Sequence, residues 1–221
     1  MNSVDSPTTT GPGNPSKRLA ILRAGLEVFA RDGFARASVE KVADVAAVST
    51  RTVYNHFTDK AGLFAAVVSF SSAAVSEIHI GEIEKHLGSI SSRADVEPAL
   101  LTYGLSMNSS VPPNAPHWRL ITQLQADADH VSPELLESWR NSGPLRTRRQ
   151  MALHLSDLAR RGFLDLDDPD IAASHLAALI NVSRSDIIDP DPSDERLEDR
   201  MRKAITTFLH GYATTAAPDE D

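Results

Sequence analysis

Helical spacing of the apolar residues restricts the fold of this chain more than any other feature of its sequence. In the first predicted helix, Leu22, Leu26 and Phe29 fall at positions i, i+4 and i+7, which places them on one side of the helix. Glycine and proline fall between segments of this kind, and no segment alternates apolar with polar residues as a half-buried strand does. The pattern therefore predicts an all-α fold.

Four predicted helices open the chain. The first covers residues 16–31 and ends near Gly33, because glycine tolerates the left-handed conformation found at helix C-termini. Ser38, Ser49 and Thr58 stand where the N-caps of the next three helices are expected. A support helix followed by two short helices and a tight turn is the arrangement of a helix-turn-helix.

The third predicted helix, STRTVYNHF at residues 49–57, is polar along most of its surface. With about 100° per residue, Val53 and Phe57 share the buried side, while Arg51 and Asn55 face the opposite way. Three further side chains flank them: Thr52, Tyr54 and His56. Arginine pairs with guanine, asparagine with adenine, and threonine contacts the methyl group of thymine. A solvated helix face is the ordinary explanation for any one of these residues, so DNA reading is predicted from the whole arrangement.

Charge is distributed unevenly along the chain. The net charge is −8, yet residues 16–70 carry eight Lys or Arg against five Asp or Glu, whereas residues 71–221 carry 14 against 24. The negative net charge argues against a protein that coats nucleic acid without sequence preference, and the uneven distribution places a slightly basic N-terminal module on an acidic body.

Other classes of protein are disfavoured by what the sequence lacks. It contains no cysteine, which excludes disulfides and thiolate metal sites. The longest apolar run, near residues 63–70, is far shorter than the roughly 18 residues that a membrane span needs. The N-terminal residues have neither the basic start nor the apolar core of a secretory signal. We therefore expect a cytoplasmic protein that does not contact a membrane.

Residues 17–68 resemble the DNA-binding domain of the TetR (tetracycline-repressor) family of bacterial transcriptional regulators. The family pattern is filled, at the expected spacing, by Phe29, Gly33, Phe34, Ser38, Val42, Ala43, Val48, Ser49, Tyr54, Phe57, Lys60, Leu63 and Phe64. One position departs from it, since Ala47 stands in the turn where the family usually has glycine. Alanine is unfavourable at positive φ, so we expect this turn to be altered or strained.

The resemblance implies roles for individual residues in binding DNA. It implies that Tyr54 and Lys60 contact phosphates, and that Ser38 or Lys41 does so at the start of the second helix. Residues in the third helix vary across the family and set the operator sequence. The full predicted DNA-binding set is Ser38, Lys41, Ser49, Thr50, Arg51, Thr52, Tyr54, Asn55, His56 and Lys60.

The remainder of the chain resembles the family more loosely, through residues 132–180, which are similar to a C-terminal domain of many TetR-like regulators. Asp168 followed by Pro169 is a good helix start. The resemblance implies a homodimer held by the last two helices, with an interface of Ile171, His175, Leu176, Leu179, Ile205, Phe208, Leu209 and Tyr212. Core packing within a single protomer is the alternative, because helical periodicity does not separate the two.

The resemblance also implies a small-molecule site among the middle helices, at roughly residues 95–160. Aromatic residues and a flexible methionine suit a largely apolar ligand with one or two polar anchors. The candidates are Tyr103, Met107, Trp118, Ile121, Gln125 and Trp139. For each of them, plain core packing is the alternative.

Catalytic, cofactor and metal motifs are not found in the sequence. It has no Gly-rich phosphate loop, nucleophile elbow or metalloprotease motif. His79 and His86 are seven residues apart, or about 10.5 Å along a helix, which is too far to share one metal ion. We therefore expect neither an enzyme nor a bound cofactor or metal.

The predicted organisation has four parts: a disordered tail at residues 1–15, a helix-turn-helix DNA-binding domain at 16–62, a helical ligand-binding and dimerisation domain at 63–214, and a disordered acidic tail at 215–221. The predicted function is that of a homodimeric transcriptional repressor that binds a palindromic operator in double-stranded DNA and is released by a small, largely apolar ligand. The alternative is a constitutive DNA-binding protein without a small-molecule effector.

Overall fold

The computed structural model of this chain describes residues 15–112, 115–126, 132–184 and 193–212. Within these ranges the regular elements are α-helices and one turn of 3-10 helix, with no β-strand among them. The all-α prediction is confirmed. The tails predicted to be disordered, residues 1–15 and 215–221, fall outside the described ranges except for Pro15, which begins the first helix.

The chain divides into two compact units, which we call the first unit and the second unit. The first combines Met1–Ser71 with Pro116–Leu136, and the second combines Ser72–Ala115 with Glu137–Asp221. The predicted domain boundary lay between residues 62 and 63. The observed division differs because a helix distant in the sequence packs into the first unit.

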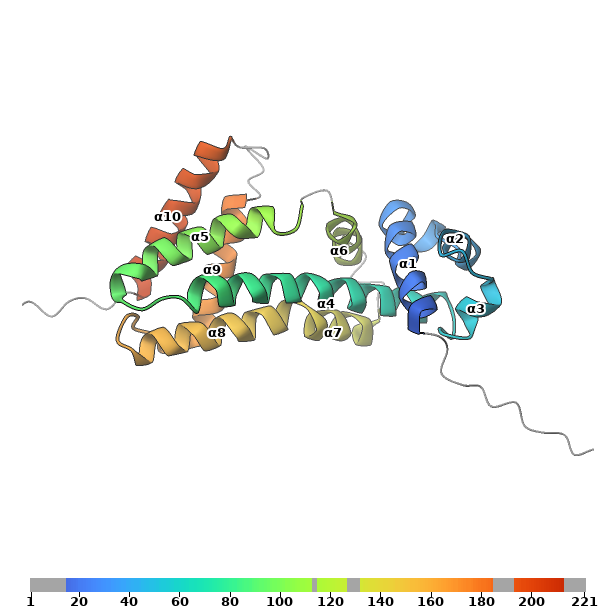
Figure 1. The fold of residues 1–221 in the computed structure, drawn as a ribbon, viewed down its shortest axis with the longest axis horizontal. Helices are drawn as coiled ribbons and strands as arrows, with labels where there is room; N and C mark the ends of the chain where they lie inside the picture. Colours follow the sequence, from blue (N-terminus) through green and yellow to red (C-terminus); the bar gives the residue numbers. More distant parts are fainter. Residues whose placement is uncertain (1–14, 113–114, 127–131, 185–192, 213–221) are drawn as a thin grey trace, which may run out of the picture. The chain divides into compact units, whose positions relative to one another are not determined.

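The first unit contains the helix-turn-helix and the helices that surround it (Figure 1). Its elements are α1 (Pro15–Arg36), α2 (Val39–Val45), α3 (Thr50–Tyr54), the start of α4 (Lys60–Leu87) and α6 (Pro116–Ala126). The apolar stripes of these helices meet in a core that includes Ile21, Val28, Phe29, Val42, Val53, Leu63, Val67 and Leu120. Helix α3 supplies a single buried residue, Val53, because the rest of its short surface is polar.

Helix α1 bends near its end, at the glycine where the sequence predicted it to stop. The backbone of Gly33 leaves the helical conformation with φ of 75°, and one more turn follows to Arg36. This bend folds the ring of Phe34 back onto the helix, where it stacks 6.4 Å from the ring of Phe29. Phe64 of α4 lies 5.0 Å from both rings. The three rings therefore join α1 to α4.

Local capping chemistry sets where the short helices begin. The hydroxyl of Ser38 accepts a hydrogen bond from the backbone of Lys41 at 3.2 Å, so Ser38 is the predicted cap of α2. Ser49 caps α3 in the same way. The prediction of Thr58 as the cap of α4 is wrong, because the carboxylate of Asp59 accepts the bond from the backbone of Gly62 at 2.8 Å. A carboxylate is also favoured by the positive end of the helix dipole.

Helix α6 packs against α1, a contact that the sequence did not reveal. Nε2 of Gln123 donates to the carbonyl of Ala30 at 3.5 Å. On the same helix, His117 is only 7% exposed, and its Nδ1 lies 2.8 Å from the hydroxyl of Ser71. Burial lowers the pKa of His117 to about 4, so its ring is neutral at pH 7. A neutral, hydrogen-bonded histidine therefore fixes α6 within the first unit.

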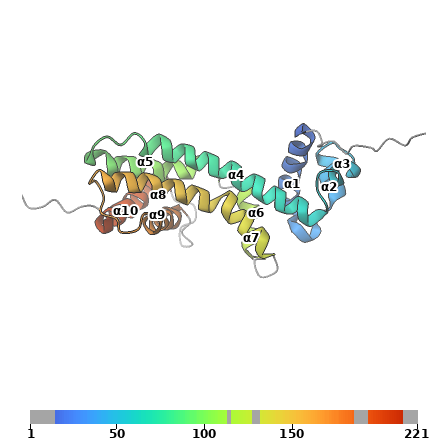
Figure 2. The ribbon, with the colours of Figure 1, turned by 90° about the horizontal axis from the view of Figure 1, so that it is seen from below.

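The second unit is a bundle built from the remainder of α4 and the later helices (Figure 2). They are the 3-10 turn η1 (Arg93–Asp95), α5 (Val96–Ser109), most of α7 (Pro133–Ser142), α8 (Pro144–Arg160), α9 (Pro169–Arg184) and α10 (Asp194–Tyr212). Helix α9 packs against both α8 and α10, and α10 packs against α5. The shared core includes Ile83, Leu100, Leu155, Leu158, Ala172, Leu176, Met201, Ile205 and Phe208.

Two local features of the second unit support this packing. Oδ1 of Asp168 accepts hydrogen bonds from the backbones of Asp170 at 2.9 Å and Ile171 at 3.0 Å, which confirms Asp168 as the cap of α9. Gly104 allows α5 to approach α10 closely, because a Cβ atom there would lie 2.5 Å from the sulfur of Met201.

Helix α4 is long and apolar, with a mean hydropathy of 1.6 over its most apolar window. Among the described residues it is the one helix that passes a length and composition test for a membrane span. Its side chains at Leu63, Val67, Val68 and Ile83 are fully buried in the protein. Such burial is the ordinary property of a core helix.

Candidate nucleic-acid interface

Helix α3 is anchored on one side and open on the other. Val53 and Phe57 are 1% and 7% exposed, so they hold the helix in the core of the first unit. We call the remaining side of α3, together with the two residues that follow it, the recognition face; it consists of Arg51, Thr52, Tyr54, Asn55 and His56. Tyr54 is 50% exposed, Arg51 and Asn55 are exposed, and the other two are half-buried.

Arg51 and Asn55 have side chains with unused hydrogen-bonding groups. Within the described residues, neither the guanidinium of Arg51 nor the amide of Asn55 makes a hydrogen bond or an ion pair. Both side chains therefore keep the donors and acceptors with which arginine recognises guanine and asparagine recognises adenine. This is the chemistry that the recognition face has to offer a partner.

Three of the predicted DNA-binding residues use their hydroxyls within the protein: Ser38, which caps α2, and Ser49 and Thr52. Oγ of Ser49 caps α3 by accepting from the backbone of Thr52 at 3.1 Å, and it lies 2.9 Å from Oγ1 of the same threonine. Thr50 is the first residue of α3 and is half-buried. The structure thus places the Ser49 and Thr52 hydroxyls in the capping of the helix.

The predicted phosphate-binding cations also have partners in the protein. Nζ of Lys41 lies 2.8 Å from Oδ2 of Asp32, and Arg31 pairs with the same carboxylate. These two cations hold the pKa of Asp32 well below its usual range. Nζ of Lys60 donates to the carbonyl of Ala35 at 3.2 Å. Exposed pairs of this kind contribute little free energy, so a phosphate can replace them.

The turn between α2 and α3 keeps a left-handed residue although that residue is alanine. Ala47 has φ of 53°. The backbone of Val48 donates to the carbonyl of Ala43 at 3.0 Å, and that of Ala47 donates to Asp44 at 3.1 Å. These are the two hydrogen bonds of a Schellman motif, which ends helices with a left-handed residue, usually glycine. The turn is therefore regular, and its strain resides in the backbone of Ala47.

Arg18 is a residue that sequence reasoning did not select, and the structure brings it to Phe57, just after the end of α3. Its Cζ atom lies 5.4 Å from the centroid of the Phe57 ring. Arg18 lies four and seven residues before two buried positions of α1, Leu22 and Gly25. That spacing was the available signal, since it places Arg18 on the buried side of α1.

The residues predicted to line a small-molecule site belong to both units. Tyr103 and Met107 are part of the core of the second unit. Trp139 is half-buried and belongs to the same unit. The other three predicted residues are in the first unit: Trp118, Ile121 and Gln125. Gln125 is exposed, and Ile121 is 7% exposed. The structure therefore does not gather the six within one unit.

The residues predicted for the dimer interface fall into a first, buried group and a second group whose members are exposed or half-buried. Leu176, Ile205 and Phe208 are at most 2% exposed and belong to the core of their own protomer, because α9 and α10 pack against each other. The exposed group comprises Ile171, which is 50% exposed, and His175. Leu179, Leu209 and Tyr212 are half-buried.

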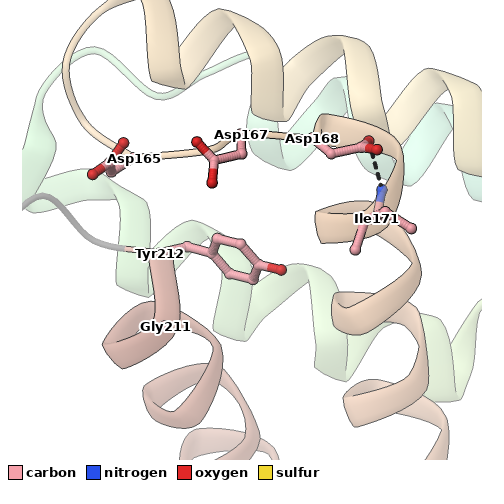
Figure 3. Close-up of a pocket in the computed structure, with 6 residues that line it drawn as sticks. All are labelled: Asp165, Asp167, Asp168, Ile171, Gly211 and Tyr212. Atoms are coloured by element: carbon pink, nitrogen blue, oxygen red, sulfur yellow. Dashed lines mark hydrogen bonds between the residues drawn. The ribbon is translucent and has the colours of Figure 1, made fainter.

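A surface hollow of about 340 Å³ adjoins this second group (Figure 3). It is lined by Asp165, Asp167, Asp168, Ile171, Gly211 and Tyr212. Asp168 is the cap of α9, and the backbone of Asp165 donates to the carbonyl of Tyr212 at 2.7 Å. Across the described part of the chain, no three His, Asp or Glu side chains are grouped as a metal ion requires. Asp168 therefore acts in capping α9, and the backbone of Asp165 joins α10 to the loop before α9.

Solved structures with the same fold include regulators of known family. A structure described as a TetR-family transcriptional regulator from Mesorhizobium loti is 26% identical, covers 91% of this chain and 100% of its own, and has a TM-score of 0.78. The flavonoid-responsive regulator FrrA is 22% identical, with coverages of 92% and 100% and a TM-score of 0.66. SmeT, the repressor of a multidrug efflux pump of Stenotrophomonas maltophilia, was solved with triclosan; it is 20% identical, with coverages of 92% and 96% and a TM-score of 0.63.

Comparison of sequences gives the family directly. No curated protein matches the chain. The family model of the bacterial regulatory proteins of the tetR family matches residues 21–67, which contain the helix-turn-helix. The model of the C-terminal domain of AefR-like transcriptional repressors matches residues 115–214. With both of its parts matched, the chain belongs to the TetR family of transcriptional regulators.

Proposed function

We propose that this regulator is a cytoplasmic, homodimeric repressor that binds a palindromic operator through α3. The observation that carries the proposal is the recognition face. There the side chains of Arg51 and Asn55 are exposed and have no partner among the described residues, while Val53 and Phe57 anchor the opposite side. Such a helix fits the major groove of DNA, whose base edges match the donors and acceptors of these two side chains.

Dimerisation through α9 and α10 is part of this proposal. Ile171 is a large apolar residue that is 50% exposed, and it lies at the edge of a hollow beside Tyr212. The AefR-like C-terminal model spans both helices. A two-fold dimer presents two recognition helices, so its half-sites lie about 34 to 36 Å apart or at a multiple of that spacing.

The proposed effector is a small molecule bound in the C-terminal part of the chain. Support comes from related structures, since SmeT was solved with triclosan and a regulator from Saccharomonospora viridis with choline. A ligand that favours one separation of the recognition helices over another changes DNA affinity by about 1 to 3 kcal/mol. The alternative function, constitutive DNA binding, is favoured by the burial of Tyr103 and Met107 in a continuous core.

Genomic footprinting with the purified full-length protein tests the proposal. We expect protection of a small number of sites with two-fold symmetry, and weaker binding when one half-site is scrambled. The genes beside these sites then supply candidate effectors for a release assay. Protection without sequence preference would overturn the proposed repressor, and release by none of the candidates would favour constitutive binding.

A further inference from the structure

The first turn of α1 lies beside the end of the recognition helix (Figures 1 and 2). There the guanidinium of Arg18 stands over the ring of Phe57, with Cζ 5.4 Å from the ring centroid. The ring of His56, a member of the recognition face, lies 6.2 Å from the same Phe57 ring. The ring of Phe57 therefore lies between Arg18 and His56, which places Arg18 one ring away from the end of the recognition face.

The positive charge at this end of α1 is not compensated within the described residues. Arg18 makes no hydrogen bond or ion pair there beyond its contact with Phe57, and neither does its exposed neighbour Lys17. The first turn of α1 contains no acidic residue. In the same unit, by contrast, Arg31 and Lys41 share the carboxylate of Asp32.

The contact with Phe57 prepares Arg18 for an anionic partner. Packing of the guanidinium against an aromatic ring restricts its position while leaving its N–H donors available. Arginine donors bind phosphate strongly, because both partners are charged and the fork can make two parallel hydrogen bonds. A strand of DNA that follows the recognition face past His56 places phosphates within reach of such a side chain.

We propose that Arg18 contacts the DNA backbone next to the bases read by α3, so that the DNA interface extends onto the first turn of α1. Lys17 adds charge at the same edge. This inference rests on the proposed DNA-binding function. Contacts to phosphate carry no sequence information, so Arg18 contributes affinity and orientation but no base preference.

The test is the salt dependence of operator binding by the full-length protein, measured by fluorescence anisotropy at several concentrations of NaCl. For Arg18→Gln we expect weaker binding and a slope of log K against log salt that is shallower by about 0.9 for each protomer. Arg18→Lys, which keeps the charge, should retain most of the wild-type slope. The loss should be the same on the best operator and on a variant with one altered base.

Arg23→Gln is the matched control. Arg23 is an exposed arginine of α1 that makes no ion pair with the described residues, and it lies five residues further along the helix, away from Phe57. We expect it to keep the wild-type slope. A wild-type slope for Arg18→Gln, or an equal reduction for both variants, would overturn the inference.

A purely structural role for Arg18 predicts a different result. If Arg18 only packed on Phe57, Arg18→Gln would lower the melting temperature and the affinity but would leave the salt slope unchanged. Failure of the underlying function is also distinguishable, since wild-type protein would then show no sequence preference at all. If the wild-type protein selects its operator and Arg18→Gln keeps the wild-type salt slope, only the phosphate contact proposed for Arg18 is wrong.

Discussion

Arg51 is the residue on which the proposed base recognition depends most directly. Its guanidinium is exposed and makes no hydrogen bond or ion pair with the described residues. We expect Arg51→Ala to weaken operator binding by about 1 to 3 kcal/mol and to relax preference at one base position. Binding to a set of operators with single base changes measures this. An equal loss on every operator would show that Arg51 contacts only the backbone.

Ala47 offers a test of strain in a single residue. A left-handed conformation is unfavourable for a residue with a Cβ atom by roughly 1 to 2 kcal/mol, and Ala47 has φ of 53°. We expect Ala47→Gly to raise the free energy of unfolding by up to about 1 kcal/mol, since the greater freedom of glycine in the unfolded chain offsets part of the gain. Urea denaturation measures the change.

The neighbouring Ala46 provides the control for this substitution. It has φ of −76°, in the right-handed helical region. Ala46→Gly should therefore lower the free energy of unfolding, because glycine adds only conformational freedom to the unfolded chain. Destabilisation by both substitutions would contradict the assignment of strain to Ala47.

Among the helices, α6 links pH to the stability of the first unit. The folded protein holds the pKa of His117 at about 4, below the ordinary value of about 6.5, so the unfolded chain binds the proton first as the pH falls. Stability is therefore complete above about pH 6.5 and decreases between pH 6.5 and 4, by at most about 1.4 kcal/mol per pH unit. Chemical denaturation between pH 7.5 and 5 measures this slope.

Two variants separate His117 from the other histidines. His117→Asn can keep a hydrogen bond to Ser71 without titrating, so it should flatten the slope above pH 5. His210→Asn is the control, because His210 is exposed at the end of α10. If His117→Asn retained the wild-type slope, another group would be responsible for the loss of stability at low pH.

The sequence predicted the starts of helices better than their packing. Ser38, Ser49 and Asp168 were predicted as caps from their residue type and position, and in the structure each accepts a hydrogen bond from a backbone group three residues away. The prediction of Thr58 as the cap of α4 was wrong because Asp59, which follows it, is also a good capping residue. Spacing alone does not show which of two adjacent capping residues begins the helix. The packing of α6 on α1 joins residues about 90 positions apart, as Gln123 and Ala30 show, and no local pattern encodes such a contact.

For the whole molecule, the central prediction concerns the dimer. Ile171 is 50% exposed beside the half-buried Tyr212. We expect Ile171→Glu to shift the protein toward monomer in analytical ultracentrifugation and to weaken operator binding, because a two-fold operator needs both recognition helices. Leu153→Glu is the control, since Leu153 is 65% exposed but lies on α8. Equal behaviour of the two variants would contradict a dimer through α9 and α10.

The fold and the recognition face were predictable from the sequence, whereas the C-terminal sites were less so. The spacing of apolar residues predicted the helices, and the positions of Val53 and Phe57 predicted which side of α3 is exposed. On α9 and α10 the same periodicity does not separate a side chain in the protomer core from one on an apolar outer face. For this reason Leu176 and Ile205, which are fully buried, were grouped with Ile171.

The shared carboxylate of Asp32 has a consequence for how the protein would meet the proposed operator. Because Asp32 offsets one of the two positive charges of Lys41 and Arg31, the junction of α1 and α2 presents a weakened positive field to an approaching polyanion. At the edge formed by the start of α1 and by α3, three cations make no hydrogen bond or ion pair with the described residues: Lys17, Arg18 and Arg51. Electrostatic attraction is therefore one-sided, and it steers the duplex toward that edge during the diffusive encounter.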